Sequence, residues 1–191
     1  MSPVPRRSKV RRQAAANPLQ IDLQSRLQRL PVSRANIAKW ARVACGSRGK
    51  GAVVAVKIVG ATEGKRLNLL WRGRDYPTNV LSFPAASLPV EPRPLGDLVL
   101  CAPVIEREAR AQCKPLAAHW AHLIVHGCLH LLGHDHERDD EALVMERRER
   151  RLLAEFGIAD PYRPSVTRDN ATRAGATRAG ATRAAKTLET R

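Results

Sequence analysis

The chain has 191 residues, 43% of them hydrophobic, which is enough for one domain with a proper core. Its net charge of +15 divides into +5 for residues 1–18, +4 for residues 164–191 and +6 for residues 19–163. No apolar run approaches the roughly 20 residues that span a bilayer, and no apolar signal segment follows the basic N-terminus. We therefore expect a cytoplasmic protein, with a mildly basic domain that suits a polyanionic partner.

Two arms of low complexity are expected to flank this domain. Residues 1–18 carry five basic groups and no acidic group, and residues 164–191 contain an Ala-Thr-Arg-Ala repeat. The five-residue period of the repeat fits neither a helix nor a strand. We expect both arms to be disordered, solvated extensions that could add salt-dependent contacts to phosphate. Residues 19–163 form the single domain.

The first half of the domain is expected to contain two helices around one strand. Ala52–Val59 is rich in β-branched side chains and lies between two glycines, which predicts a strand. Ser33 can cap the helix before it and Thr62 the helix after it. The apolar residues expected along these two helices are Ile37, Trp40, Ala41 and Ala44 in the first and Leu67, Leu70 and Trp71 in the second.

The second half is expected to add two strands and three helices. Val80–Phe83 and Asp97–Cys101 predict strands, separated by a proline-rich loop. Pro103 opens one helix and Pro115 opens a longer one, whose apolar character on every side implies burial. A last helix spans about Asp139–Phe156. This mixture of helices with a small sheet predicts an α+β fold.

Histidines are concentrated at the end of the long apolar helix, where five of the chain's six fall between His122 and His136. His126 and His130 are four residues apart, so they share one helix face. Gly133 can end the helix in a left-handed conformation and return His136 towards them. Three converging neutral imidazoles typically bind zinc and leave its fourth position open for water. The spacing therefore predicts a catalytic metal site on His126, His130 and His136.

Other polar residues lie close to this motif. His134 is the main alternative as third ligand. His122 precedes His126 by four residues, shares its face and is expected to line the cleft. Asp135 is expected to orient a histidine ligand by a hydrogen bond. A structural role is expected for His119.

The histidine spacing parallels the H-E-x-x-H-x-x-G-x-x-H motif of zinc proteases but differs at one position. Those enzymes place a glutamate directly after the first histidine as general base, where this chain has Gly127. Peptide hydrolysis by that route is therefore disfavoured. The segment also lacks the clustered carboxylates of a two-metal nuclease, so any assisting residue must come from elsewhere in the chain.

Two groups of arginines could contact an anionic ligand. Arg72 and Arg74 lie where the second helix ends. The guanidinium group of an arginine can donate two parallel hydrogen bonds to a phosphate. Composition alone favours a surface loop in which both arginines pair with Asp75. The last helix carries a further cluster, for which we expect solvated ion pairs, with an RNA-facing stripe as the alternative. That cluster consists of Arg147, Arg148, Arg150 and Arg151, alternating with Glu146 and Glu149.

Four stretches of the chain form a recognisable set: Trp71–Pro84, Leu95–Val99, His119–His122 and His126–His136. Taken together, they resemble the YbeY family of bacterial rRNA maturation factors. The resemblance covers roughly residues 19–162. It implies an α+β fold in which a small mixed β-sheet is packed by several helices. It also implies a metal-dependent, single-strand-specific endoribonuclease that acts in 16S rRNA 3′-end maturation and ribosome quality control.

The resemblance further implies one zinc ion per chain on His126, His130 and His136, and a functional arginine at Arg72. We expect this arginine to stabilise the negative charge of the transition state. The expected partners are single-stranded rRNA and the small ribosomal subunit with its proteins, and neither DNA nor a membrane is expected. Either water or the substrate's own 2′-OH could be the attacking group. The alternative functions are a non-catalytic, metal-stabilised ribosome-assembly factor and a zinc-dependent hydrolase or peptidase.

Overall fold

The computed structural model describes residues 17–86, 89–134 and 138–163. The two predicted arms therefore lie outside the described residues, except for positions 17 and 18. In chain order the elements are β1 (Gln20–Ser25), α2 (Arg34–Cys45), the 3-10 turn η1 (Gly46–Gly49), β2 (Ala52–Val59), α3 (Ala61–Arg72), β3 (Val80–Pro84), β4 (Arg93–Cys101), α4 (Ala102–Ala111), α5 (Leu116–Leu131) and α6 (Asp139–Ala154). In these described ranges, no helix is both long enough and apolar enough to cross a membrane.

Four strands form one mixed sheet in the order β1-β2-β4-β3. β1 and β4 both pair with β2 in parallel, whereas β3 pairs with β4 antiparallel and lies at the edge. The α+β fold and its small mixed sheet are thus as predicted. β1 was not expected, although Leu19, Ile21 and Leu23 alternate with polar residues as in a half-buried strand.

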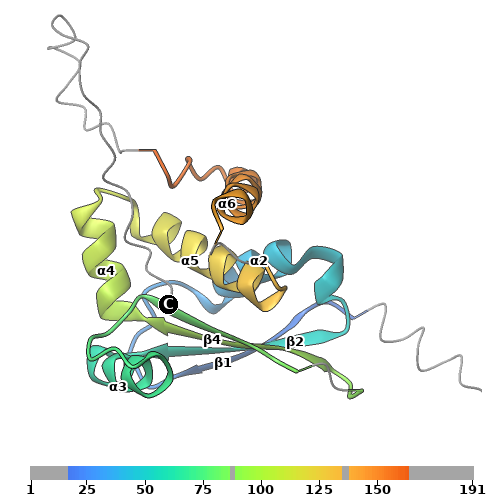
Figure 1. Ribbon diagram of the computed structural model, residues 1–191, viewed down its shortest axis with the longest axis horizontal. Helices are drawn as coiled ribbons and strands as arrows, with labels where there is room; N and C mark the ends of the chain where they lie inside the picture. Colours follow the sequence, from blue (N-terminus) through green and yellow to red (C-terminus); the bar gives the residue numbers. More distant parts are fainter. Residues whose placement is uncertain (1–16, 87–88, 135–137, 164–191) are drawn as a thin grey trace, which may run out of the picture.

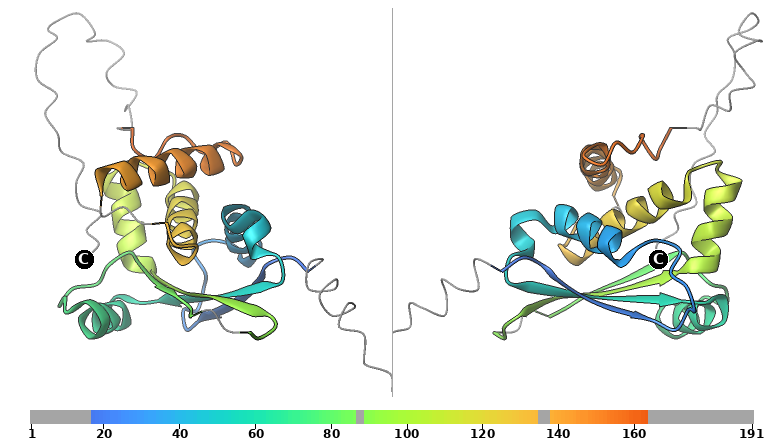
Figure 2. Two further views of the ribbon diagram at one scale, coloured as in Figure 1. Left: turned by 45° about the vertical axis from the view of Figure 1, so that its right-hand side comes forward. Right: turned by 180° about the vertical axis from the view of Figure 1, so that it is seen from behind.

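The helices cover the two faces of the sheet unequally (Figures 1 and 2). α2 and α5 pack on one face, α4 lies beside α5, and α6 crosses α5 on the side away from the sheet. These elements enclose the main hydrophobic core, which includes Trp40, Leu98 and Trp120. α3 lies on the opposite face, over a smaller core around Val59 and Leu81 to which Val104 of α4 also contributes.

Local sequence signals account for most helix boundaries. Ser33 caps α2, its Oγ accepting a hydrogen bond from the backbone N–H of Asn36 at 3.1 Å. The prediction for Thr62 is wrong, because α3 begins at Ala61 and the residue before it is Gly60. Gly60 is followed directly by helical backbone, so Thr62 lies inside the first turn and not at its cap.

Gly127 allows α5 to lie close to the sheet. A Cβ at this position would come within 2.8 Å of Leu98 Cδ2 and 3.1 Å of Ser82 Oγ. Any larger side chain would force the helix away from β3 and β4 or displace those residues. The glycine that stands at the protease general-base position is therefore required by packing in this fold.

Candidate metal centre

The end of α5 is fixed by a left-handed glycine, as the sequence predicted. Gly133 has φ +80°, and the N–H groups of Gly133 and His134 donate to the carbonyls of His130 and Leu129 at 2.9 and 3.0 Å. The guanidinium of Arg48 donates to the carbonyl of Leu132 at 3.0 Å. These bonds satisfy the free carbonyls of the last turn and set the direction in which the chain leaves the helix.

His126 and His130 face one another at the end of α5. Their Nε2 atoms lie 3.2 Å apart. Zinc–nitrogen bonds of about 2.0–2.1 Å in tetrahedral geometry separate two ligand nitrogens by roughly 3.3–3.4 Å. The pair therefore fits two ligands of a single ion, and the same distance suits an N–H···N hydrogen bond when no ion is bound.

A fully buried carboxylate lies on the other side of the His126 ring. Glu149 of α6 is 0% exposed, and its Oε1 lies 2.9 Å from His126 Nδ1. Its Oε2 lies 2.9 Å from His122 Nε2 and accepts a 2.5 Å hydrogen bond from the Tyr162 hydroxyl. Within the described ranges, His122, His126 and Glu149 form a His/His/Glu group whose potential ligand atoms all lie within 4.8 Å of one another.

Burial and hydrogen bonding in this group determine which of its side chains carry protons. Burial alone would raise the pKa of Glu149, but the hydrogen bonds from His122 and His126 outweigh it and hold that pKa well below its usual range. Burial and the charge of Glu149 raise the pKa of Tyr162, so its phenol stays protonated and donates. An ionised carboxylate only accepts, so His126 donates its Nδ1–H and keeps the lone pair of Nε2 facing His130.

The expectation that Glu149 forms a solvated surface pair is therefore wrong. A signal for its burial was present in the sequence, because Met145, Glu149 and Leu152 follow the i, i+4, i+7 spacing of one buried helix face. The rest of the cluster is partly as expected: Arg150 pairs with Glu146 at 2.8 Å. Arg150 also lies 3.2 Å from a carboxylate oxygen of Asp160, at the turn before Tyr162.

His119 belongs to a separate polar network one turn earlier on α5. Its Nε2 lies 2.9 Å from Oε2 of Glu108, and the same carboxylate accepts from the side-chain amide of Asn79 at 3.1 Å. Asn79 Oδ1 in turn accepts the backbone N–H of Val80 at 2.6 Å. This network joins α4 and α5 to the start of β3, which agrees with the structural role expected for His119.

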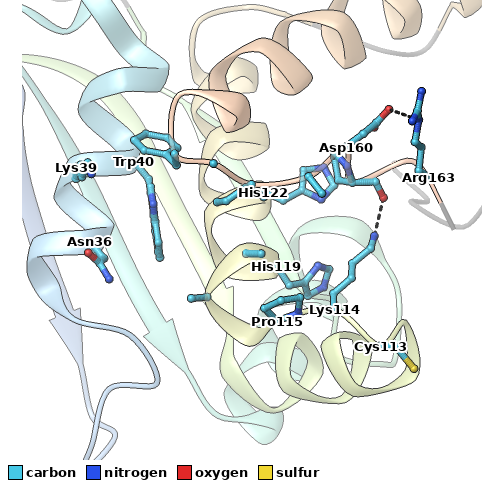
Figure 3. A pocket seen from close by; sticks show the side chains of 17 residues that line it. Asn36, Lys39, Trp40, Cys113, Lys114, Pro115, His119, His122, Asp160 and Arg163 are labelled. Carbon is cyan, nitrogen blue, oxygen red and sulfur yellow. Dashed lines mark hydrogen bonds and ion pairs between the residues drawn. The ribbon is translucent and has the colours of Figure 1, made fainter. Parts of the chain in front are cut away.

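His122 and His119 also line a cavity of about 790 Å³ between α2, the start of α5 and residues 156–163 (Figure 3). Trp40 and Phe156 supply apolar walls. Lys114 also lines it and donates to the Pro161 carbonyl at 2.6 Å. His122 was expected to line the cleft of the metal site, whereas neither His126 nor His130 lines this cavity, so that expectation stays a prediction.

Of the other predicted residues of the histidine motif, only His134 is described by the structure. His136 and Asp135 lie outside the described residues. His134 is half-buried, and it does not join His126 and His130 in a three-residue group within 4.8 Å among the described residues. Burial, Arg148 and Arg48 lower its pKa.

Arg72 is exposed and is the last residue of α3, a helix that lies on the opposite face of the sheet from α5. Within the described part of the chain, its side chain has no hydrogen-bond or ion-pair partner. Asp75 pairs with Lys65 at 3.0 Å, not with Arg72. The expected pairing of Arg72 with Asp75 is therefore not observed.

A four-stranded α+β fold that buries a His/His/Glu group with the donor atoms of a metal site places the chain among metal-binding α+β proteins. The chain belongs to the YbeY family, since residues 22–157 match the family model described as Endoribonuclease YbeY. A protein of that name from Alkalilimnicola ehrlichii is 62% identical over 130 residues, which cover 65% of this chain and 78% of the relative. A second protein of that name, from Pseudomonas entomophila, is 48% identical over 155 residues, which cover 78% of this chain and 96% of the relative.

The fold is also similar to the solution structure of TM1509 from Thermotoga maritima. The two share 24% sequence identity with a TM-score of 0.50, over 75% of this chain and 99% of that one. At this identity the likeness concerns the fold alone.

Proposed function

We propose that this chain is a metal-dependent, single-strand-specific endoribonuclease that acts in 16S rRNA 3′-end maturation and in ribosome quality control. The observation that carries the proposal is the His126–His130 pair, with Nε2 atoms 3.2 Å apart, in a chain whose relatives are named endoribonucleases. A net charge of +6 over residues 19–163 supports an RNA substrate.

The proposed metal ligands are His126, His130 and His136, with one zinc ion per chain. The distance between the Nε2 atoms of His126 and His130 fits two ligands of one zinc ion. His136 is proposed as the third ligand from its position in the sequence after the turn at Gly133. When bound, the ion would act as a Lewis acid towards a phosphodiester oxygen or a water molecule.

Glu149 supports this site from behind, because its hydrogen bond fixes the tautomer and direction of the His126 ring. His122 and Tyr162 hold the carboxylate in turn. The hydrogen bonds around Glu149 thus fill the orienting role that the sequence suggested for Asp135, whose own part stays a proposal.

Arg72 is proposed to stabilise negative charge on the RNA phosphates during cleavage. Its exposed guanidinium at the end of α3 is available to an anionic ligand. Because α3 and α5 pack on opposite faces, RNA that contacts both Arg72 and the histidines would pass over the β3 edge.

The proposed partners are single-stranded rRNA and the small ribosomal subunit with its proteins, in the cytoplasm. The test is cleavage of a 16S rRNA 3′ fragment by the metal-loaded chain, in single-stranded form and annealed to a complementary strand. We expect cleavage of the single-stranded form alone. Failure of highly purified, fully loaded protein to cut either form would contradict the proposal and favour a non-catalytic assembly factor.

A further inference from the structure

Exposed apolar side chains gather at the end of α3. Among the described residues, seven large hydrophobic side chains are exposed, and four of them lie between positions 69 and 76. Trp71 and Tyr76 are 60% and 47% exposed, and Leu69 and Leu70 are 48% and 64% exposed. Large apolar side chains that are exposed close together along a chain often mark a contact site for a partner.

The two aromatic rings are held in place by neighbours. The Trp71 ring packs against Phe83 of β3, with centroids 5.5 Å apart and an interplanar angle of 59°. The side chain of Asn68 donates to the Tyr76 carbonyl at 2.7 Å. Arg74 donates to the Tyr76 hydroxyl at 2.6 Å. Rings fixed before binding lose little conformational freedom when a ligand stacks on them.

The surroundings of these rings are basic. Residues 65–76 contain four basic groups and one acidic group, Asp75. Asp75 is paired with Lys65 at 3.0 Å, Arg74 contacts the Tyr76 hydroxyl, and Arg72 directly follows Trp71 in the chain. Aromatic rings interleaved with arginines are the combination that binds single-stranded nucleic acid, through stacking on bases and contact with phosphates.

This surface lies next to the strand on which α5 sits. Neighbouring side chains of β3 point to opposite faces of the sheet. Phe83 contacts Trp71 on the α3 side, whereas Ser82 lies against Gly127 of α5. β3 is the edge strand, so one extended chain passing over it can contact both helices (Figure 2).

We propose that Trp71, Tyr76, Arg72 and Arg74 form a platform, here called the α3 platform, that binds nucleotides of single-stranded RNA flanking the cleaved bond. Trp71 and Tyr76 stack on the bases, and Arg72 and Arg74 contact the phosphates. The inference rests on the proposed function for its substrate. A duplex presents no free base faces, so the platform also selects single strands.

Tryptophan fluorescence tests this directly, because Trp71 is the only exposed tryptophan of the three. Trp40 and Trp120 are 5% and 0% exposed. Titration of the metal-loaded chain with a short oligouridine should quench the fluorescence to saturation, and the same amount of duplex RNA should not. The absence of quenching would overturn the proposal even if every variant failed to fold.

Substitutions test whether the aromatic rings of Trp71 and Tyr76 make the contact with RNA. With a labelled oligouridine and anisotropy as readout, Trp71→Ala and Tyr76→Ala should each raise Kd by about tenfold, the scale of one lost stacking contact. Trp71→Phe should bind within about twofold of the parent, because it keeps an aromatic face. Leu143→Ala, which truncates a 53% exposed side chain on α6, is the matched control and should bind like the parent.

The outcomes separate this inference from the proposed function. If oligouridine quenches the tryptophan fluorescence but the chain cleaves no RNA, the proposed function is contradicted and RNA binding by the α3 platform is still supported. Cleavage by the parent together with unchanged oligouridine affinity in Trp71→Ala would overturn the platform. If Trp71→Ala keeps the parent affinity for RNA but no longer binds proteins of the small subunit, the platform is also overturned, because this surface would then bind a protein partner.

Discussion

Glu149 Oε1 lies 2.9 Å from His126 Nδ1, and the carboxylate that makes this contact is fully buried. A buried ionised group is costly unless each of its oxygens is hydrogen-bonded. Here Tyr162 and His122 occupy the second oxygen. The arrangement directs Nε2 of His126 towards His130 and thereby couples the packing of α6 on α5 to the geometry of the proposed metal site.

Glu149→Gln should weaken metal binding. A glutamine of the same size can accept from only one of the histidines, and its NH₂ group would face another donor. Metal affinity should fall about 10- to 100-fold, the usual effect of losing a hydrogen bond behind a ligand. Competition with a chromophoric chelator measures this, with Glu146→Gln on the same helix as the control. Parent-like affinity in Glu149→Gln would contradict the orienting role.

Gly127→Glu should destabilise the fold without creating a peptidase. The new side chain would enter a space in which even a Cβ lies 2.8 Å from Leu98 Cδ2. We expect the free energy of unfolding to fall by roughly 3 kcal/mol or more, from overpacking and burial of a carboxylate. Denaturant unfolding checks this against Ala117→Glu, which adds the same side chain at an exposed position of α5. Equal stability of the two variants would refute the packing account of Gly127.

His136→Ala and His134→Ala should differ in metal content. We expect the first to lose the metal, because His136 is the proposed third ligand. The second should keep it, because the His134 backbone N–H closes the end of α5 and its side chain is not grouped with His126 and His130. Mass spectrometry of metal per chain distinguishes the two. Retention by His136→Ala with loss by His134→Ala would reverse the assignment.

Arg72→Ala should slow RNA cleavage while the metal and the fold are kept. A preorganised donor to transition-state charge is typically worth ~3–4 kcal/mol, which corresponds to a rate loss of about 10²–10³-fold. Single-turnover cleavage of a 16S rRNA fragment measures the effect, with the exposed Arg151→Ala as the control. A parent-like rate in Arg72→Ala would remove its catalytic role.

Signals within one element predicted much of the fold. The β-branched run of β2, the proline before α5 and the turn at Gly133 are local, and the structure has them where the sequence indicated. The histidine pair was also predictable, because i, i+4 spacing fixes a shared helix face.

What the sequence did not predict depends on contacts between elements. Glu149 looked like a surface residue because arginines surround it, and only the packing of α6 on α5 places it beside His126. The exposure of Trp71 was likewise missed, since an aromatic residue on a helix is more often part of the core.

The most direct test of the account measures metal content and rRNA cleavage on the same preparation of His130→Ala, beside the parent chain. His130 supplies one of the two nitrogens that face each other 3.2 Å apart. The account predicts that the variant loses the bound metal and the cleavage of single-stranded 16S rRNA together. Cleavage at the parent rate by a metal-free variant would contradict it.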